Sequence, residues 1–187
     1  MNRREAVQYI SLLLGGTIAG SSYFLAGCKS NTGVSMVFTP DDVSYLDEIA
    51  DTILPTTSTP GAKAAKVGQF MTVMVNDCYD ETDQKILHEG MTKLDDFSKK
   101  TYDDSFMKIN AQQRHDLLVK LDNEQKEYMK NKKPEDPSHY FRMMKELTLL
   151  GYFTSEIGCT QARRYVETPG RYEGCIPYKK GDKAFAT

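Results

Sequence analysis

Residues 138–156 read SHYFRMMKELTLLGYFTSE. The spacing predicts a helix, and its apolar side chains leave it almost no polar face. A helix that is apolar nearly all round is buried on several sides. We therefore expect this segment to lie at the centre of a helical bundle, or to be covered in addition by a partner protein. Gly158 follows it and is predicted to end it as a C-cap.

Four further helices are predicted ahead of this one. The first begins at Thr39-Pro40-Asp41-Asp42, where Thr39 is the N-cap, Pro40 takes the first helical position, and the acids lie at the positive end of the helix dipole. Apolar residues at helical spacing predict the next two helices at about 67–79 and 81–100. Asn110 and Gln113 form a plausible capping box for the fourth. The predicted fold class is all-α, a compact bundle of about five helices.

The C-terminal tail, residues 159–187, is rich in Gly, Pro and Tyr and is predicted to be mostly irregular, with a short helix at 161–165. Tyrosines cluster late in the chain, at Tyr140, Tyr152, Tyr165, Tyr172 and Tyr178. Tyrosine is amphipathic and favours interfaces, although a tyrosine-rich core rim has the same composition. The tail is therefore a candidate binding surface.

The N-terminus has the order of parts found in an export signal. Arg3 and Arg4 precede an apolar run at 9–27, which closes on Leu25-Ala26-Gly27-Cys28. The paired arginines resemble a twin-arginine (Tat) signal, and the closing residues resemble a bacterial lipobox. We interpret residues 1–27 as the signal, Cys28 as the lipidated residue, 28–37 as a tether and 38–187 as one helical domain. The alternative is a transmembrane anchor at 9–27. Both interpretations place the domain outside the cytoplasm and close to a membrane.

Three cysteines remain once Cys28 is assigned to lipid. Cys159 and Cys175 are the favoured disulfide pair, because the flexible loop between them can bend back. An odd thiol could instead bond a partner subunit. Cys78 lies on the apolar face of a predicted helix and is interpreted as a buried free thiol.

The sequence predicts no catalytic, cofactor-binding or metal site in this chain. His88, His115 and His139 lie on separate predicted elements without the ligand spacing of known metal sites. Adjacent acids such as Asp95 and Asp96 point apart on a helix, so they are interpreted as solvated charge. The net charge is −2, and no basic patch suggests nucleic acid. A small exported helical domain without such a site is expected to act by binding another protein.

Two stretches carry a resemblance to a known family. The first runs from Phe38-Thr39-Pro40 through ADTILP at 50–55 and TPGA at 59–62 to VGQF at 67–70. The second is LTLLGYFTS at 147–155, followed by PGRYEGC at 169–175. Both resemble gluconate 2-dehydrogenase subunit 3, the small subunit of membrane-bound flavin-dependent sugar and sugar-acid dehydrogenases.

The resemblance implies a non-catalytic accessory subunit without a cofactor of its own. FAD is expected in a large partner subunit of the glucose–methanol–choline (GMC) oxidoreductase type, which passes electrons to a cytochrome c or a quinone. The small subunit carries the Tat signal, so that the folded partner is exported with it to the periplasmic side of the envelope. The lipobox departs from the family pattern, because a lipid on Cys28 would anchor the complex in place of a cytochrome subunit. The substrate of the complex is not transferable from the family name.

The partner interface is expected to be large and apolar. Its candidate residues come from the end of the 138–156 helix and from the tail: Tyr152, Phe153, Pro169, Gly170 and Tyr172. The alternative to an interface role is that these residues only complete the hydrophobic core of a small domain. The alternative function is a free-standing envelope lipoprotein with a binding or scaffolding role.

Overall fold

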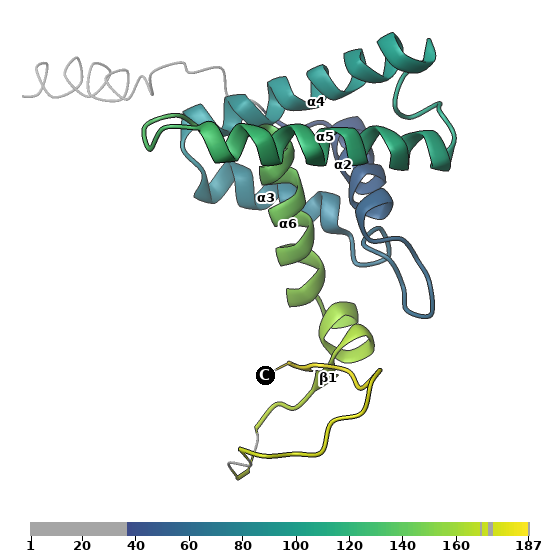
Figure 1. The fold of residues 1–187 in the computed structure, drawn as a ribbon, viewed down its shortest axis with the longest axis vertical. Coiled ribbons are helices and arrows are strands. Elements are labelled where there is room, and N and C mark those ends of the chain that lie inside the picture. The colour runs from purple at the N-terminus through teal and green to yellow at the C-terminus, as the bar shows by residue number, and fades with distance from the viewer. Residues whose placement is uncertain (1–36, 169, 172–173, 187) are drawn as a thin grey trace, which may run out of the picture. The chain divides into compact units, whose positions relative to one another are not determined.

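The computed structural model describes residues 37–168, 170–171 and 174–186 (Figure 1). Arg3, Arg4 and Cys28 lie outside the described residues. The helices are α2 (Pro40–Ile53), α3 (Val67–Cys78), α4 (Glu81–Tyr102), α5 (Ala111–Asn131), α6 (Tyr140–Thr154) and the short π-helix η1 (Gly158–Ala162). Two short strands, β1 (Arg164–Tyr165) and β2 (Phe185–Ala186), complete the described elements. The predicted all-α class is confirmed.

Helices α2 and α5 begin where their capping residues predict. The Thr39 hydroxyl accepts from the Asp42 backbone N–H at 3.2 Å, and the Asp42 carboxylate accepts from the Thr39 N–H at 2.8 Å. Asn110 and Gln113 make the same reciprocal pair at 2.9 and 3.0 Å. Each box satisfies backbone N–H groups that a helix start otherwise leaves without partners.

Helix α3 is capped by another helix instead of by its own preceding residue. Its N-cap, Lys66, has a left-handed backbone with φ 55° and makes no side-chain capping bond. Asp47 of α2 supplies the acceptor, with its Oδ1 2.7 Å from the backbone nitrogen of Gly68. A Cβ at Gly68 would lie 2.5 Å from the Val43 carbonyl oxygen, so only glycine allows this approach. Burial raises the pKa of Asp47, and the bond from Gly68 offsets this only in part.

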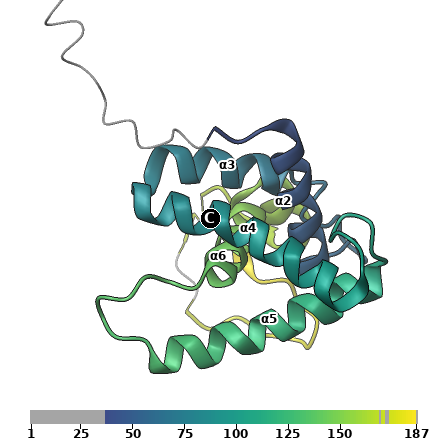
Figure 2. The ribbon, with the colours of Figure 1, turned by 90° about the horizontal axis from the view of Figure 1, so that it is seen from above.

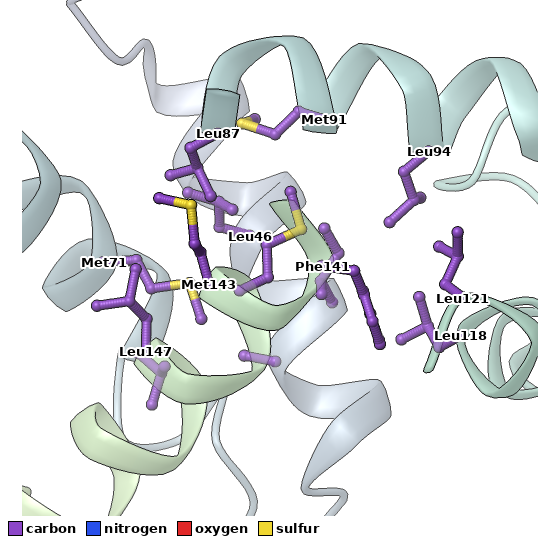
Figure 3. Packing of buried hydrophobic residues seen from close by; sticks show 14 of the residues in the cluster. Leu46, Met71, Leu87, Met91, Leu94, Leu118, Leu121, Phe141, Met143 and Leu147 are labelled. Atoms are coloured by element: carbon purple, nitrogen blue, oxygen red, sulfur yellow. The ribbon is translucent and has the colours of Figure 1, made fainter. Parts of the chain in front are cut away.

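Helix α6 is the centre of the bundle, as predicted. It contacts α2, α3, α4 and α5, and from above it lies between α5 on one side and the α2–α3 pair on the other (Figure 2). Phe141 points toward Leu118 and Leu121 of α5 (Figure 3). The buried residues of α6 are Phe141, Met143, Met144, Leu147, Thr148, Gly151 and Tyr152.

The opposite side of α6 is open. Leu149 is 37% exposed and Leu150 is 46% exposed. The sequence predicted an apolar surface nearly all round this helix, and the bundle covers only part of it. Among the described residues, no helix is both long and apolar enough to cross a membrane.

Ion pairs fasten α5 to its neighbours. Lys145 of α6 reaches Asp122 of α5 at 2.6 Å, and Arg114 of α5 pairs with Glu48 of α2. Partial burial by itself would raise the pKa of Asp122, but hydrogen bonds from Lys126, Lys145 and Gln125 outweigh it and lower this pKa to about 2. Asp122 is therefore an ionised link between α5 and α6 over the neutral range.

Three local predictions are corrected by the structure. The short helix predicted at 161–165 begins earlier, as η1, and Arg164 and Tyr165 form strand β1 instead. Ser155, not Gly158, is the C-cap of α6. Gly158 instead starts η1, where a Cβ would lie 1.8 Å from the Tyr152 carbonyl oxygen. Cys78 is exposed because it is the last residue of α3, beyond the turns that pack on the core.

We expect the contribution of Asp122 to stability to depend on pH. A carboxyl whose folded pKa lies below its unfolded value stabilises the fold fully above the unfolded pKa, about 4, and loses this effect as the pH falls toward about 2. Asp122→Asn should therefore be less stable than the wild type at neutral pH, with a gap that closes over that acidic window. Urea unfolding at a series of pH values measures the gap.

Asp96→Asn is the matched control, because the Asp96 side chain is 68% exposed and lies 3.8 Å from Lys99. Its effect on the free energy of unfolding should be small throughout. A gap between the wild type and Asp122→Asn that stays constant from neutral to acidic pH would contradict the assignment.

Candidate functional site

Two segments far apart in the chain meet at the C-terminal end of α6. The Tyr152 hydroxyl donates to the carbonyl oxygen of Pro60 at 2.6 Å, which ties α6 to the loop between α2 and α3. That loop is closed by the Ala62 N–H, which donates to the Leu54 carbonyl at 2.9 Å. Buried tyrosine hydroxyls normally find such a partner. The contact fixes the end of α6, from which the tail departs.

The tail is held by a small parallel sheet. Arg164 of β1 lies opposite Phe185 of β2, and Tyr165 lies opposite Ala186. The backbone N–H of Arg164 donates to the Ala184 carbonyl at 2.8 Å. Figure 1 shows this segment beyond the end of α6, away from α4 and α5. The sheet brings the two ends of a loop of about twenty residues together.

Large apolar side chains are exposed along the tail. The exposed fraction reaches 74% for Tyr178. The others are Tyr165, Ile176 and Phe185, each close to half exposed. Exposed apolar side chains that gather on one segment are typical of binding surfaces. We call these four side chains, together with Leu149 and Leu150, the C-terminal apolar surface.

Basic side chains accompany these apolar ones. The Arg163 guanidinium lies 4.6 Å from the Phe153 ring centroid, and that of Arg164 lies 3.8 Å from the Phe185 ring centroid. They border an open groove of ≈ 570 Å³. The groove is lined by Thr160, Arg163, Arg164, Tyr165, Asp182 and Lys183.

The profile of one protein family matches residues 40–170, and that family is described as gluconate 2-dehydrogenase subunit 3. The chain belongs to this family. No curated protein and no solved structure matches the chain. The family match covers the α2–α3 loop, α6 and the start of the tail. It therefore includes both segments that meet where Tyr152 bonds Pro60.

The predicted interface residues of this subunit 3 family member have different outcomes. Tyr152 is only 4% exposed and its hydroxyl is bonded to Pro60, so its predicted role at a partner surface is corrected to a structural one. Phe153 is half-buried beneath Arg163. Gly170 is exposed, with no atom within 4 Å of the position a Cβ would take. Pro169 and Tyr172 lie outside the described residues.

Several exposed residues of the C-terminal apolar surface were not singled out by sequence reasoning. Ile176 and Phe185 are not part of any recognisable sequence motif. The position of Phe185 depends on its strand pairing with Arg164, which local sequence patterns cannot reveal. The late tyrosines were the available signal. Of these, Tyr165 and Tyr178 are exposed, whereas Tyr152 is buried and Tyr140 is half-buried.

The predicted Cys159–Cys175 disulfide is not formed in the structure. The described cysteines Cys78, Cys159 and Cys175 are all free thiols. The Cys159 thiol donates to the Phe153 carbonyl oxygen at 3.2 Å, which holds it against the end of α6, whereas Cys175 is exposed in the tail. The local turn after α6, rather than the loop to Cys175, decides where the Cys159 sulfur lies.

His139 and His88 make contacts that stabilise the fold. His139 is the N-cap of α6, and its Nδ1 accepts from the Phe141 N–H at 3.2 Å. Burial lowers the pKa of His139, which favours the neutral form that such a cap requires. His88 stacks on Phe38 with ring centroids 4.2 Å apart. Within the described part of the chain, no group of three His, Cys, Asp or Glu side chains could hold a metal ion.

Tyr152→Phe tests the link between α6 and the α2–α3 loop. Removing the hydroxyl leaves the Pro60 carbonyl without its donor, and we expect a loss of about 1 kcal/mol in the free energy of unfolding. Urea denaturation provides the measurement. Tyr178→Phe, at a largely exposed tail position, is the control and should leave stability unchanged. Equal stability of Tyr152→Phe and the wild type would show that the bond contributes nothing.

Proposed function

We propose that the chain is the non-catalytic small subunit of a membrane-associated, FAD-dependent GMC-type dehydrogenase that oxidises a sugar or sugar acid. Its task is to bind, stabilise and help export the large subunit. The observation that carries the proposal is the family match over residues 40–170, because the family is described as a dehydrogenase subunit. FAD belongs to the large subunit in this proposal, and electrons pass from it to a cytochrome c or a quinone.

The C-terminal apolar surface supports binding of a partner. A permanent interface is large and more apolar than the rest of a protein surface. Leu149 and Leu150 expose apolar side chains on the open side of α6, beside the Arg142–Glu146 ion pair, and the tail adds Tyr165, Ile176 and Phe185. The core is complete without these side chains. Covering them would lower the free energy of an assembled complex.

The N-terminal sequence supports a role in export. FAD is a cytoplasmic product, so a flavoprotein must fold around it before crossing the membrane. A partner without its own signal then needs a tightly bound carrier, and the Tat-like arginines Arg3 and Arg4 fit that task. Lipid on Cys28 would keep the complex at the periplasmic side of the envelope as a membrane-anchored lipoprotein. The competing function is a free-standing envelope lipoprotein.

Affinity purification of the chain from membranes tests the function. We expect a large protein with flavin absorbance to co-purify with the wild type. A variant with Leu149→Asp and Leu150→Asp should lose most of the flavin, because charge on the open side of α6 cannot be buried without a large desolvation cost. Val119→Asp, at an exposed position of α5, is the matched control and should retain it.

A monodisperse wild-type monomer without flavoprotein would reject the dehydrogenase function in favour of the free-standing lipoprotein. Retention of flavin by the double variant would reject only the placement of the interface on α6.

Cys28→Ser tests the anchor separately. Removal of the acylated thiol should move the protein from the membrane fraction to the soluble fraction, as fractionation and immunoblotting would detect. Ser30→Ala, two residues further on, is the control and should stay in the membrane fraction. Membrane retention of uncleaved Cys28→Ser protein would support the transmembrane anchor at 9–27.

A further inference from the structure

We infer that the C-terminal segment binds an acidic surface, and that carboxylates of the large subunit occupy the basic groove between η1, β1 and residues 182–183, just before β2. The inference rests on the proposed function and names the chemistry of the partner surface. It is drawn from the charge distribution of the chain, from how the basic side chains of the groove are held, and from their lack of ionic partners.

The charge of the tail is opposite to that of the bundle. Residues 158–187 contain six basic and three acidic side chains, whereas residues 37–157 contain 22 acidic and 15 basic ones. The whole chain has a formal net charge of only −2, which conceals this division. Separated charge of this kind steers partners of opposite sign toward one part of a molecule.

The basic groups of the groove are held in place by uncharged neighbours. The guanidinium of Arg164 lies over the Phe185 ring, and that of Arg163 lies over the Phe153 ring. The Lys183 ammonium donates to the Gln161 carbonyl oxygen. A guanidinium on an aromatic face is positioned by that contact and still has N–H groups available for a carboxylate.

These cations have no ionic partner within the described residues. No carboxylate there lies within ion-pair distance of Arg163, Arg164 or Lys183. Asp182 also lines the groove, and its Oδ2 accepts from the Lys179 backbone N–H at 2.8 Å. In the bundle, by contrast, buried or half-buried basic groups such as Arg114 and Lys145 reach carboxylates.

A protein surface fits this segment better than a small anion does. Arg164 and the exposed Tyr165 lie on β1, and the exposed Phe185 lies opposite Arg164 on β2. Apolar and cationic groups are therefore presented by the same small sheet. Interfaces combine an apolar centre with a charged rim in this way, and Arg is enriched there. The expected counterpart is an apolar patch bordered by Asp and Glu.

A second copy of this chain is the weaker candidate, although its bundle is acidic. Tail-to-bundle contact between copies is a heterologous interface, which extends into a ring or filament unless its rotation closes. A different acidic chain forms a closed pair without that restriction. We therefore assign the groove to the large subunit.

The test uses the complex purified with the full chain. In a variant carrying Arg163→Gln, Arg164→Gln and Lys183→Gln, we expect the affinity for the large subunit to fall about tenfold or more at low salt. The difference should shrink at high salt, because exposed charges are then screened. The control replaces Lys85, Lys93 and Lys100 of α4 by Gln, which removes the same charge from the bundle, and should change affinity less than about twofold.

Circular dichroism and urea unfolding of both triple variants separate loss of charge from loss of fold. If the folded tail variant binds the large subunit as tightly as the wild type at low salt, the inference is overturned and the proposed function stands. If no flavoprotein binds the wild type, the proposed function fails and the inference fails with it.

Two further measurements address other occupants. Concentration-dependent oligomers of the isolated chain that the tail variant dissolves would assign the groove to a second copy. Sedimentation with vesicles of anionic phospholipid that depends on the tail charges, while the complex is unaffected by them, would assign it to the membrane surface. Either result would overturn the assignment to the large subunit.

Discussion

The apolar surface of α6 requires cover from several directions, and the arrangement of the bundle follows from this requirement. The buried residues between Phe141 and Tyr152 span about half of the helix circumference, which is wider than the stripe of a typical surface helix. Helices α2, α3, α4 and α5 all contact it. Loops between these helices must therefore return each one to the same central axis, and the bond from Tyr152 to Pro60 fastens one of them there.

Two glycines allow close approaches between elements of the bundle. Gly68 lets α3 approach α2, and Gly151 lies where a Cβ would come within 2.5 Å of the Phe70 ring. Both glycines lie within residues 40–170, the range that the family profile matches. A function carried out by contact would use surfaces that this packing leaves open, such as the far side of α6 and the tail.

Sequence reasoning was more successful for the bundle than for the binding surface. The buried residues Leu87, Met91 and Leu94 of α4, and Leu117, Leu118 and Leu121 of α5, recur at the helical spacing that predicts a buried helix face. The same reasoning placed Tyr152 at a partner surface, because an aromatic residue near a helix end fits a core or an interface equally well. Its burial depends on the loop at Pro60, more than ninety residues earlier. Likewise, the thiol of Cys159 is positioned by the turn after α6.

The sequence by itself determined the helices whose starts and faces are encoded within a few residues. Thr39 with Asp42 and Asn110 with Gln113 cap their own helices, and such bonds form between neighbours whatever the rest of the chain does. The tertiary structure alone decided the start of α3, where Asp47 of another helix supplies the cap, and the pairing of Arg164 with Phe185 across a parallel sheet. The physical reason is the distance along the sequence between the residues in contact. A contact between residues twenty or more positions apart forms only after packing has brought the segments together, and no local pattern records it.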